Sequence, residues 1–247
     1  IIFKNPLASP DIIGVASGAN LGAAIAIIFL TGGTLSVAIS AFVGGVGAVF
    51  VALGLAKLSR EKGVVTFVLA GIVIGSIAQG VIMMMKYLAD PEKELATMEF
   101  WAMGSFASVT ADKVLTMLPL FLIGIIGIIL LRWKINVLSL SDEEAKSLGV
   151  KVESARWAVI IFSTLIVASI ICITGLIAFI GLIAPHIARM IRKTNDFSTT
   201  ILSGFIGAIL LGFADCLARS IAGSEIPISI LTTFIGAPYL AYLMSRY

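Results

Sequence analysis

Long apolar stretches, separated by short polar connections, run through the whole sequence. A helix needs about 20 mainly apolar residues to cross the hydrocarbon core of a bilayer. Eight stretches come near this length, and only three of the 17 basic and 14 acidic side chains fall inside them. We therefore predict an all-α integral membrane protein, a polytopic helical bundle. The eight predicted spans are Ile12–Leu30, Leu35–Ala56, Val64–Met85, Val114–Leu131, Trp157–Ile173, Gly175–Ile191, Ile201–Ile221 and Ile226–Met244.

The sixth predicted span is the least regular of the eight. Gly175, Gly181 and Pro185 interrupt its apolar run, and both residue types weaken the interior of a helix. We expect a short or broken helix in this stretch.

The positions of Lys and Arg indicate the orientation of the chain. If the spans cross alternately, 13 of these residues fall on one side of the membrane and four on the other. Cytoplasmic loops carry the excess of Lys and Arg, so the first side, which holds the C-terminus, is predicted to be cytoplasmic. The larger group contains Lys4, Lys57, Arg60, Lys62, Arg132, Lys134, Lys146, Lys151, Arg156, Arg189, Arg192, Lys193 and Arg246. The smaller group contains Lys86, Lys93, Lys113 and Arg219.

The composition agrees with a lipid bilayer as the solvent. Hydrophobic residues make up 59% of the chain and charged residues 13%, with a mean hydropathy of +1.11. A soluble domain would carry about a quarter charged residues. The net charge of +3 gives no indication of a nucleic-acid partner. Cys172 and Cys216 stand alone, without metal-ligand spacing, so no metal site is predicted.

Small residues recur at four-residue spacing in several predicted spans. In lipid, such stripes allow helix backbones to approach closely and gain van der Waals contact. We interpret them as packing faces. The stripes are Gly14, Gly18 and Gly22; Gly44, Ala48, Ala52 and Ala56; Gly71 and Gly75; and Gly204, Ala208 and Gly212.

Two charges inside a predicted span allow two interpretations. Asp215 and Arg219 are four residues apart, so on a helix they share a face and can neutralise each other. Alternatively, Arg219 lies near the outer end of its span and reaches an acidic partner.

Catalytic chemistry has little support in the sequence. The GxxxxGK[ST] loop that cradles phosphate is missing, so ATP is not expected to bind this chain. A serine hydrolase needs a serine and a base, and Ser17 with His186, the single histidine, is the pair considered. Neither lies in a hydrolase motif, and we predict no catalytic residues. An ion-coupled secondary carrier remains a second alternative.

The connection Arg132–Arg156 has its own helix signals. Ser141 can cap a helix whose first turn contains three acidic residues, and Glu144 stands at the capping-box position. Gly149 is a suitable stop. We predict a short amphipathic helix with Leu140, Ala145 and Leu148 available for packing.

The run LSLSDEEAKSLGV within this connection resembles the cytoplasmic coupling segment of FecCD-type permeases. These belong to bacterial type II ABC importers for iron-siderophores, haem and cobalamin. Four further stretches resemble the same family in the same order, so the resemblance covers essentially the whole chain. They are Asn5–Ala23, Phe100–Thr110, Gly175–Ile191 and Ala214–Leu243.

The resemblance implies a permease of ten helices in the bacterial cytoplasmic membrane, of which this chain would lack the first two. We expect one transmembrane domain over residues 1–247, with a coupling segment at 139–150. The implied partners are ATP-binding cassette ATPase subunits, which hold ATP and Mg, an extracytoplasmic binding protein, and an identical or paralogous second permease subunit. No cofactor is expected on this chain, and the cargo would be an iron-siderophore, haem or cobalamin.

The resemblance also assigns roles to particular residues. Arg219 matches an arginine that faces a glutamate of the binding protein. Ser229 departs from the glycine usual at its position, and Asn195–Thr199 lacks the usual aspartate-histidine-arginine pattern. The implied ATPase-coupling residues are Leu140, Ser141, Asp142, Glu143, Glu144, Ala145, Lys146, Ser147, Leu148 and Gly149. The pathway and gate candidates are Gly71, Gly75, Gln79, Met83, Phe100, Trp101 and Phe106.

Overall fold

The computed structural model describes residues 1–3, 10–30, 32–59, 64–221 and 226–244, and these contain helices but no strand. Contacts within the chain define two compact units. The α1–α4 unit comprises Pro10–Gly124 and Ser163–Leu176, and the α6–α11 unit comprises Ile1–Ser9, Ile125–Phe162 and Ile177–Tyr247. Two continuous helices, α5 (Ala111–Leu130) and α8 (Val152–Thr174), contribute to both units.

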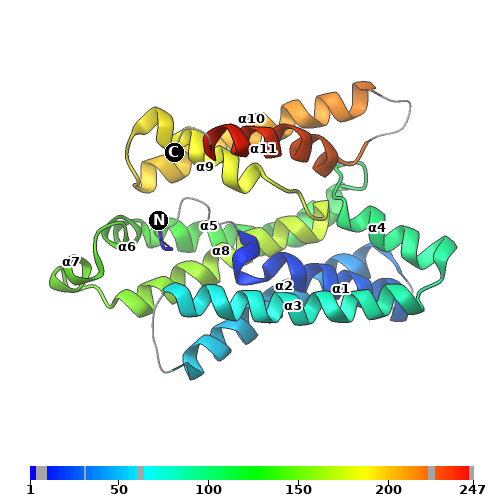
Figure 1. The fold of residues 1–247 in the computed structure, drawn as a ribbon, viewed down its shortest axis with the longest axis horizontal. Coiled ribbons are helices and arrows are strands. Elements are labelled where there is room, and N and C mark those ends of the chain that lie inside the picture. The colour runs from blue at the N-terminus through cyan, green and yellow to red at the C-terminus, as the bar shows by residue number, and fades with distance from the viewer. Residues whose placement is uncertain (4–9, 31, 60–63, 222–225, 245–247) are drawn as a thin grey trace. The chain divides into compact units, whose positions relative to one another are not determined.

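The α1–α4 unit is built on three helices that pack side by side (Figure 1). Their contacting faces consist largely of alanine and glycine, as a membrane bundle requires when close backbone approach supplies the stabilisation. Its elements are η1 (Pro10–Ile13), α1 (Val15–Phe29), α2 (Thr34–Leu58), α3 (Val64–Leu88), the π-helical turn η2 (Pro91–Leu95) and α4 (Ala96–Ala102).

Glycine stripes bring α1 and α2 into backbone contact. A Cβ atom added at Gly22 would collide with the carbonyl oxygen of Ser40, and one at Gly44 with that of Gly18. Gly71 on α3 packs in the same way against the Ile12 carbonyl of η1. The predicted packing role of these stripes is confirmed.

The α6–α11 unit contains two short helices and three longer ones. Helix α10 packs on α9 and α11, and Gly207 of α10 faces Ala184 and Ile180 of α9. Ser229, the residue that departs from the family pattern, accepts a hydrogen bond from the Ala178 N–H at 3.4 Å. The elements are α6 (Arg132–Leu138), α7 (Asp142–Ser147), α9 (Ile180–Arg192), α10 (Phe197–Ile221) and α11 (Ile228–Met244).

Five of the eight predicted spans form helices long and apolar enough to cross a membrane: α2, α3, α5, α8 and α10. The chain is therefore a multi-pass membrane protein. Helices α1 and α11 are apolar but shorter, with 15 and 17 residues. The sixth span is a 13-residue helix, α9, as its glycines and proline suggested. Backbone at Gly175 (φ +71°) and Phe179 (φ +67°) is left-handed, so the helix cannot begin before Ile180.

One predicted packing stripe differs in the structure. Gly204 and Gly212 on α10 have open space where a Cβ would lie, so they do not form the packing face of this helix within the chain. The buried small residues of α10 are Gly207, Ala214 and Ala218. The prediction identified a small-residue helix but placed its packing face at the wrong register.

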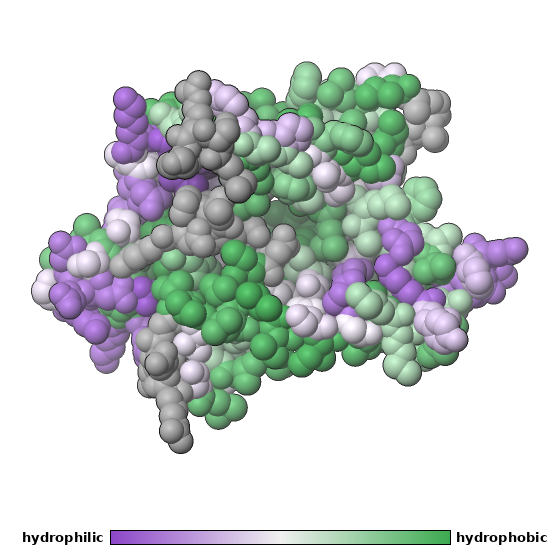
Figure 2. All heavy atoms as spheres, in the orientation of Figure 1, coloured by the Kyte–Doolittle hydropathy of each residue, from purple (hydrophilic) through white to green (hydrophobic). Residues whose placement is uncertain are grey.

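Exposed apolar side chains cover the long helices, and Figure 2 shows such residues over α3. Hydrophilic residues gather instead over α7 and over the turn that leads into α4. This distribution fits a chain whose helices face lipid and whose connections face water. The orientation prediction includes Lys4, Arg60, Lys62 and Arg246, which lie outside the described residues, as do residues 5–9 and 222–225 of two resembling stretches.

Candidate coupling site and pathway segment

Helix α7 has the capping box that the sequence predicts. Ser141 Oγ accepts a hydrogen bond from the Glu144 N–H at 3.2 Å, and Glu144 Oε2 accepts one from the Ser141 N–H at 2.9 Å. Two N–H groups that a helix start leaves without partners are therefore satisfied by local side chains. Asp142, Glu143 and Glu144 in the first turn also suit the positive end of the helix dipole.

The other end of α7 closes in a Schellman motif. The Val150 N–H donates to the Ala145 carbonyl at 3.1 Å, and the Gly149 N–H donates to the Lys146 carbonyl at 2.9 Å. Gly149 has φ +80°, a conformation that glycine adopts without steric cost. The predicted helix stop is confirmed, and both ends of this six-residue helix are satisfied within the chain.

One side of α7 packs against the rest of the protein, and the other side is exposed. Ala145 is buried, in a cluster with residues of α6 and of the start of α8. Leu140 and Leu148 are 42% and 53% exposed. Of the three residues expected to be available for packing, Ala145 thus packs inside this unit, and the two leucines present apolar surface. Glu143, Lys146 and Ser147 are also exposed.

Arg156 on α8 fixes the start of α7. Its Nη2 atom donates to both carboxylate oxygens of Asp142, at 2.8 and 3.0 Å, while the arginine itself is only 4% exposed. Its Nε atom has no hydrogen-bond partner among the described residues. A buried guanidinium depends strongly on its counter-charge, so this pair holds α7 against α8. The sequence prediction missed Arg156, although its burial beside Ala155 and Val159 follows from helical spacing.

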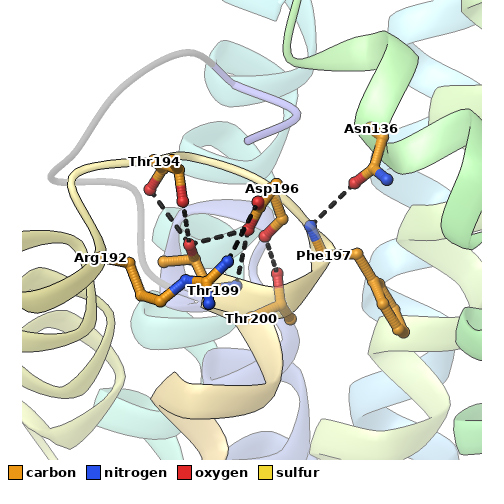
Figure 3. A network of polar contacts seen from close by, with 7 residues as sticks. All are labelled: Asn136, Arg192, Thr194, Asp196, Phe197, Thr199 and Thr200. Carbon is orange, nitrogen blue, oxygen red and sulfur yellow. Dashed lines mark hydrogen bonds and ion pairs between the residues drawn. The ribbon is translucent and has the colours of Figure 1, made fainter.

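A polar network joins α6 to the start of α10 (Figure 3). Asn136 Oδ1 on α6 accepts the Phe197 N–H at 2.8 Å. Asp196, which precedes α10, accepts the Thr199 N–H at 2.8 Å and the Thr199 hydroxyl at 2.9 Å. Hydrogen bonds from the Thr199 backbone and then from its hydroxyl, with the charge of Arg192, lower the pKa of Asp196. Asn195–Thr199, the stretch that departs from the family pattern, is therefore a capped helix start.

The four pathway candidates on α3 divide into two pairs. Gly71 and Gly75 lie where α3 packs on η1 and α1, with the Ser17 hydroxyl beside Gly75. Gln79 and Met83, one and two turns further along, are exposed. The glycines therefore have a packing role, while the pathway role of all four stays a prediction.

The three remaining pathway candidates lie in or just after α4. The Phe100 side chain is 67% exposed, whereas Trp101 and Phe106 are half-buried. The Ser105 N–H donates to the Thr174 carbonyl at the end of α8, at 2.8 Å. A Cβ atom at Gly175 would collide with the Trp101 carbonyl. Residues 100–110 are thus fastened to the end of α8. Their pathway role stays a prediction, and they are called the pathway segment below after that predicted role.

An ion pair connects α3 with α4. Lys86 Nζ donates to Glu99 Oε1 at 2.7 Å, and the two side chains are 27% and 45% exposed. Asp90 caps the intervening turn by accepting the N–H groups of Glu92 and Lys93. The chain direction between α3 and the pathway segment is therefore fixed by polar contacts.

Arg219 forms the ion pair that its spacing allows. Its Nε donates to Asp215 Oδ2 at 3.0 Å, and the arginine side chain is 49% exposed. The pair lies in the last two turns of α10. Because the Arg219 side chain is half exposed, a binding protein can reach it. The docking role of Arg219 stays a prediction.

Ser17 and His186 occupy packing environments. Ser17 lies beside Gly75 of α3. His186 contacts the Tyr239 ring edge to face, with ring centroids 6.1 Å apart. These contacts give each residue a packing role and do not favour the hydrolase alternative.

Several known proteins are similar to this chain over nearly its whole length. The family model of the FecCD transport family matches residues 1–246. The molybdate import system permease protein MolB of Haemophilus influenzae is 36% identical over 99% of this chain and 72% of its own length. The Fe(3+)-citrate import system permease protein YfmE of Bacillus subtilis is 36% identical over 98% and 73%. The hemin transport system permease protein HmuU of Yersinia pestis is 32% identical over 99% and 75%.

A solved structure shares the fold. It is described as an inward-facing conformation of a metal-chelate type ABC transporter, and it matches with a TM-score of 0.92 and 36% identity. The match covers 100% of this chain and 78% of the other. The chain therefore belongs to the FecCD transport family and has the helical fold of its permeases.

Proposed function

We propose that this chain is the permease subunit of an ATP-driven importer, which conducts a metal chelate delivered by a binding protein. The observation that carries the proposal is α7, a helix that is capped at both ends and anchored by Arg156 while it presents Leu140 and Leu148 outward. Such a helix offers a rigid apolar surface to a cytoplasmic partner.

The partner that fits α7 is an ATPase subunit. The sequence has no phosphate-binding loop of its own, so the energy of ATP reaches this chain through a protein contact. Exposed Glu143 and Lys146 would form the polar rim around the two leucines. ATP and Mg would then be bound by the partner and not by this chain.

On the other side of the membrane, we propose that Arg219 contacts the binding protein. An arginine that is half exposed at a helix end, with one acidic neighbour already in place, can pair with a carboxylate of the binding protein. The proposed orientation puts this helix end outside the bacterial cytoplasmic membrane and the C-terminus in the cytoplasm. The second permease subunit completes the pathway in this proposal.

The names of the relatives support a proposed cargo class. Their names include Fe(3+)-citrate and hemin, which are iron chelates, and also molybdate. We propose an iron-siderophore or a related chelate such as haem or cobalamin. A weakly interacting apolar pathway suits selection by the binding protein, because a tightly held cargo could not leave.

Reconstitution tests this proposal. The chain would be placed in proteoliposomes with its ATPase and binding protein, and ATP hydrolysis and uptake measured with ferric siderophore, haem, cobalamin and molybdate in turn. We expect one chelate to stimulate both. Stimulation by molybdate alone would contradict the chelate class. Uptake driven by a proton or sodium gradient without the ATPase would overturn the proposal in favour of the secondary carrier.

A further inference from the structure

We infer that the start of α6 and the end of α9 form a binding site for the headgroup of an anionic phospholipid. The ligand comes from the bilayer itself, so this role is separate from the cargo, the ATPase and the binding protein of the proposed function. The residues of the site, called the headgroup cluster below, are Arg132, Trp133, Lys134, Arg192 and Lys193.

The headgroup cluster lies where membrane-spanning helices end. Helix α5 has 20 residues, which at 1.5 Å per residue span about 30 Å, the thickness of the hydrocarbon core. Helix α6 begins at Arg132, two residues after the end of α5, so Arg132 and Trp133 lie at the level of the lipid headgroups. The start of α10, another helix long enough to span, is joined to α6 by the hydrogen bond between Asn136 and Phe197. The connection 193–196 therefore lies at the same membrane boundary.

Exposed apolar side chains adjoin the basic ones on both helices. Leu130 at the end of α5 and Trp133 on α6 are exposed, as are Met190 and Ile191 on α9. The four basic side chains of the cluster, which lie next to them in the sequence, are exposed as well. Tryptophan prefers the headgroup level of a bilayer. A surface that suits acyl chains thus continues directly into one that suits anionic headgroups.

The basic side chains of the headgroup cluster have little counter-charge. Arg132, Lys134 and Lys193 form no ion pair with any residue that the structure describes. Arg192 lies 3.6 Å from Asp196, whose carboxylate also accepts hydrogen bonds from the first turn of α10. Four positive charges therefore share a single acidic partner within the described part of the chain, and an added anion can neutralise the remainder.

Hydrogen bonds hold the two halves of the headgroup cluster around the start of α10 (Figure 3). Asn136 Oδ1 accepts the Phe197 N–H at 2.8 Å. Trp133 and Arg132 precede Asn136 by three and four residues, so they share its side of α6. The Lys193 N–H closes the end of α9 by donating to a carbonyl of that helix at 2.7 Å. The backbone around the site is therefore ordered before a ligand binds, which lowers the entropic cost of binding.

The apolar neighbours favour a lipid over other sources of phosphate. An arginine binds phosphate oxygens through paired N–H groups, and free phosphate could satisfy these charges. Free phosphate would leave Trp133, Met190 and Ile191 uncovered, whereas the acyl chains of a phospholipid pack on them. Phosphatidylcholine would bring its own cation to a cationic site, so an anionic headgroup such as that of phosphatidylglycerol fits better.

Quenching of Trp133 fluorescence reports which lipid lies at the cluster. The chain has three tryptophans, so Trp101→Phe with Trp157→Phe leaves Trp133 alone. The full chain is reconstituted in bilayers of phosphatidylcholine and phosphatidylglycerol in which one lipid or the other carries brominated acyl chains. The ratio of the two quenching efficiencies gives the preference for the anionic lipid. Native mass spectrometry of the unsubstituted chain, which counts retained lipids of each kind, gives the same comparison without the tryptophan changes.

We expect phosphatidylglycerol to quench Trp133 several-fold more strongly than phosphatidylcholine at equal mole fraction, and to be the lipid that is retained. Arg132→Gln should lower this preference by about fivefold, the usual effect of one basic residue at a membrane surface. Adding Lys193→Gln should bring the two lipids close to equality. The matched control is Lys57→Gln with Lys93→Gln, which removes the same charge from exposed positions outside the cluster and should leave the preference unchanged.

Three results would overturn the lipid site. The first is equal quenching and equal retention of the two lipids with all four basic residues in place. The second is an equal loss of preference in the control pair, because the preference would then reflect net charge alone. The third is a loss of preference in excess inorganic phosphate but not in sodium chloride of the same ionic strength, because the ligand would then be soluble phosphate. None of these measurements needs transport, so failure of the proposed function would leave the test intact.

Discussion

The side-chain oxygen of Asn136 accepts the backbone N–H of Phe197, 61 residues further along the chain, at 2.8 Å. A residue of α6 thus caps the start of α10, so the two helices are joined by this hydrogen bond. We expect Asn136→Ala to lower the free energy of unfolding by about 1 kcal/mol, the usual value of a helix cap. Thermal unfolding in detergent measures this, with exposed Asn195→Ala as the control. Equal stability of the two variants would contradict the capping role.

The Asp196 cap predicts a dependence on pH. Hydrogen bonds from Thr199 lower the pKa of this carboxyl in the folded state. A lowered pKa contributes stability above the unfolded-state pKa, near 3.8, and this stability is lost as the pH falls through the folded value. Asp196→Asn should therefore reduce the difference in melting temperature between pH 6 and acid, about pH 3. An unchanged difference in melting temperature would show that Asp196 does not cause the dependence of stability on pH.

Two adjacent glutamates should behave differently when their charge is reversed. Glu144 closes the capping box, whereas Glu143 is exposed on the same helix. Glu144→Lys should destabilise α7 by about 1 kcal/mol, and faster hydrogen exchange of residues 141–149 would show it. Glu143→Lys should leave this exchange unchanged and weaken ATPase binding in the reconstituted complex. Equal ATPase binding by Glu143→Lys and the unsubstituted chain would remove Glu143 from the contact.

Backbone contact between α1 and α2 predicts a difference between two glycines of one helix. Gly44→Ala places a methyl group against the Gly18 carbonyl, whereas Gly54→Ala meets open space. We expect Gly44→Ala to lower the free energy of unfolding by about 1–3 kcal/mol or more, the range for overpacking. Gly54→Ala should leave the free energy of unfolding unchanged or raise it slightly. Denaturant titration in mixed micelles compares the two. Equal midpoints would indicate that α1 and α2 are further apart than described.

Local signals in the sequence were sufficient to predict α7. A capping box and a stop glycine act within a few residues of each other, so the spacing of Ser141, Glu144 and Gly149 determines the helix. Long apolar runs likewise identified α2, α3, α5, α8 and α10. The break before α9 was visible in its glycines, but the left-handed Phe179 has no local signal.

Contacts between distant residues could not be predicted in the same way. The Arg156–Asp142 and Asn136–Phe197 contacts depend on how four helices, α6, α7, α8 and α10, are arranged, which no short pattern encodes. On α10, small residues occur on two faces, and spacing alone does not decide whether Gly204 or Gly207 is buried. Tertiary packing determines which of the two glycines is buried, and this is why the sequence pattern placed the packing face of α10 at the wrong register.

The two closed ends of α7 have a thermodynamic consequence for any protein that binds it. Fixing the backbone of a flexible residue costs roughly 1–2 kcal/mol in conformational entropy, and a disordered loop would incur this loss at the moment of association. Helix α7 is already ordered by its own caps and by Arg156 before any partner arrives. The contact energy of Leu140 and Leu148 is therefore not reduced by the cost of ordering the α7 backbone, although association still costs translational and rotational freedom.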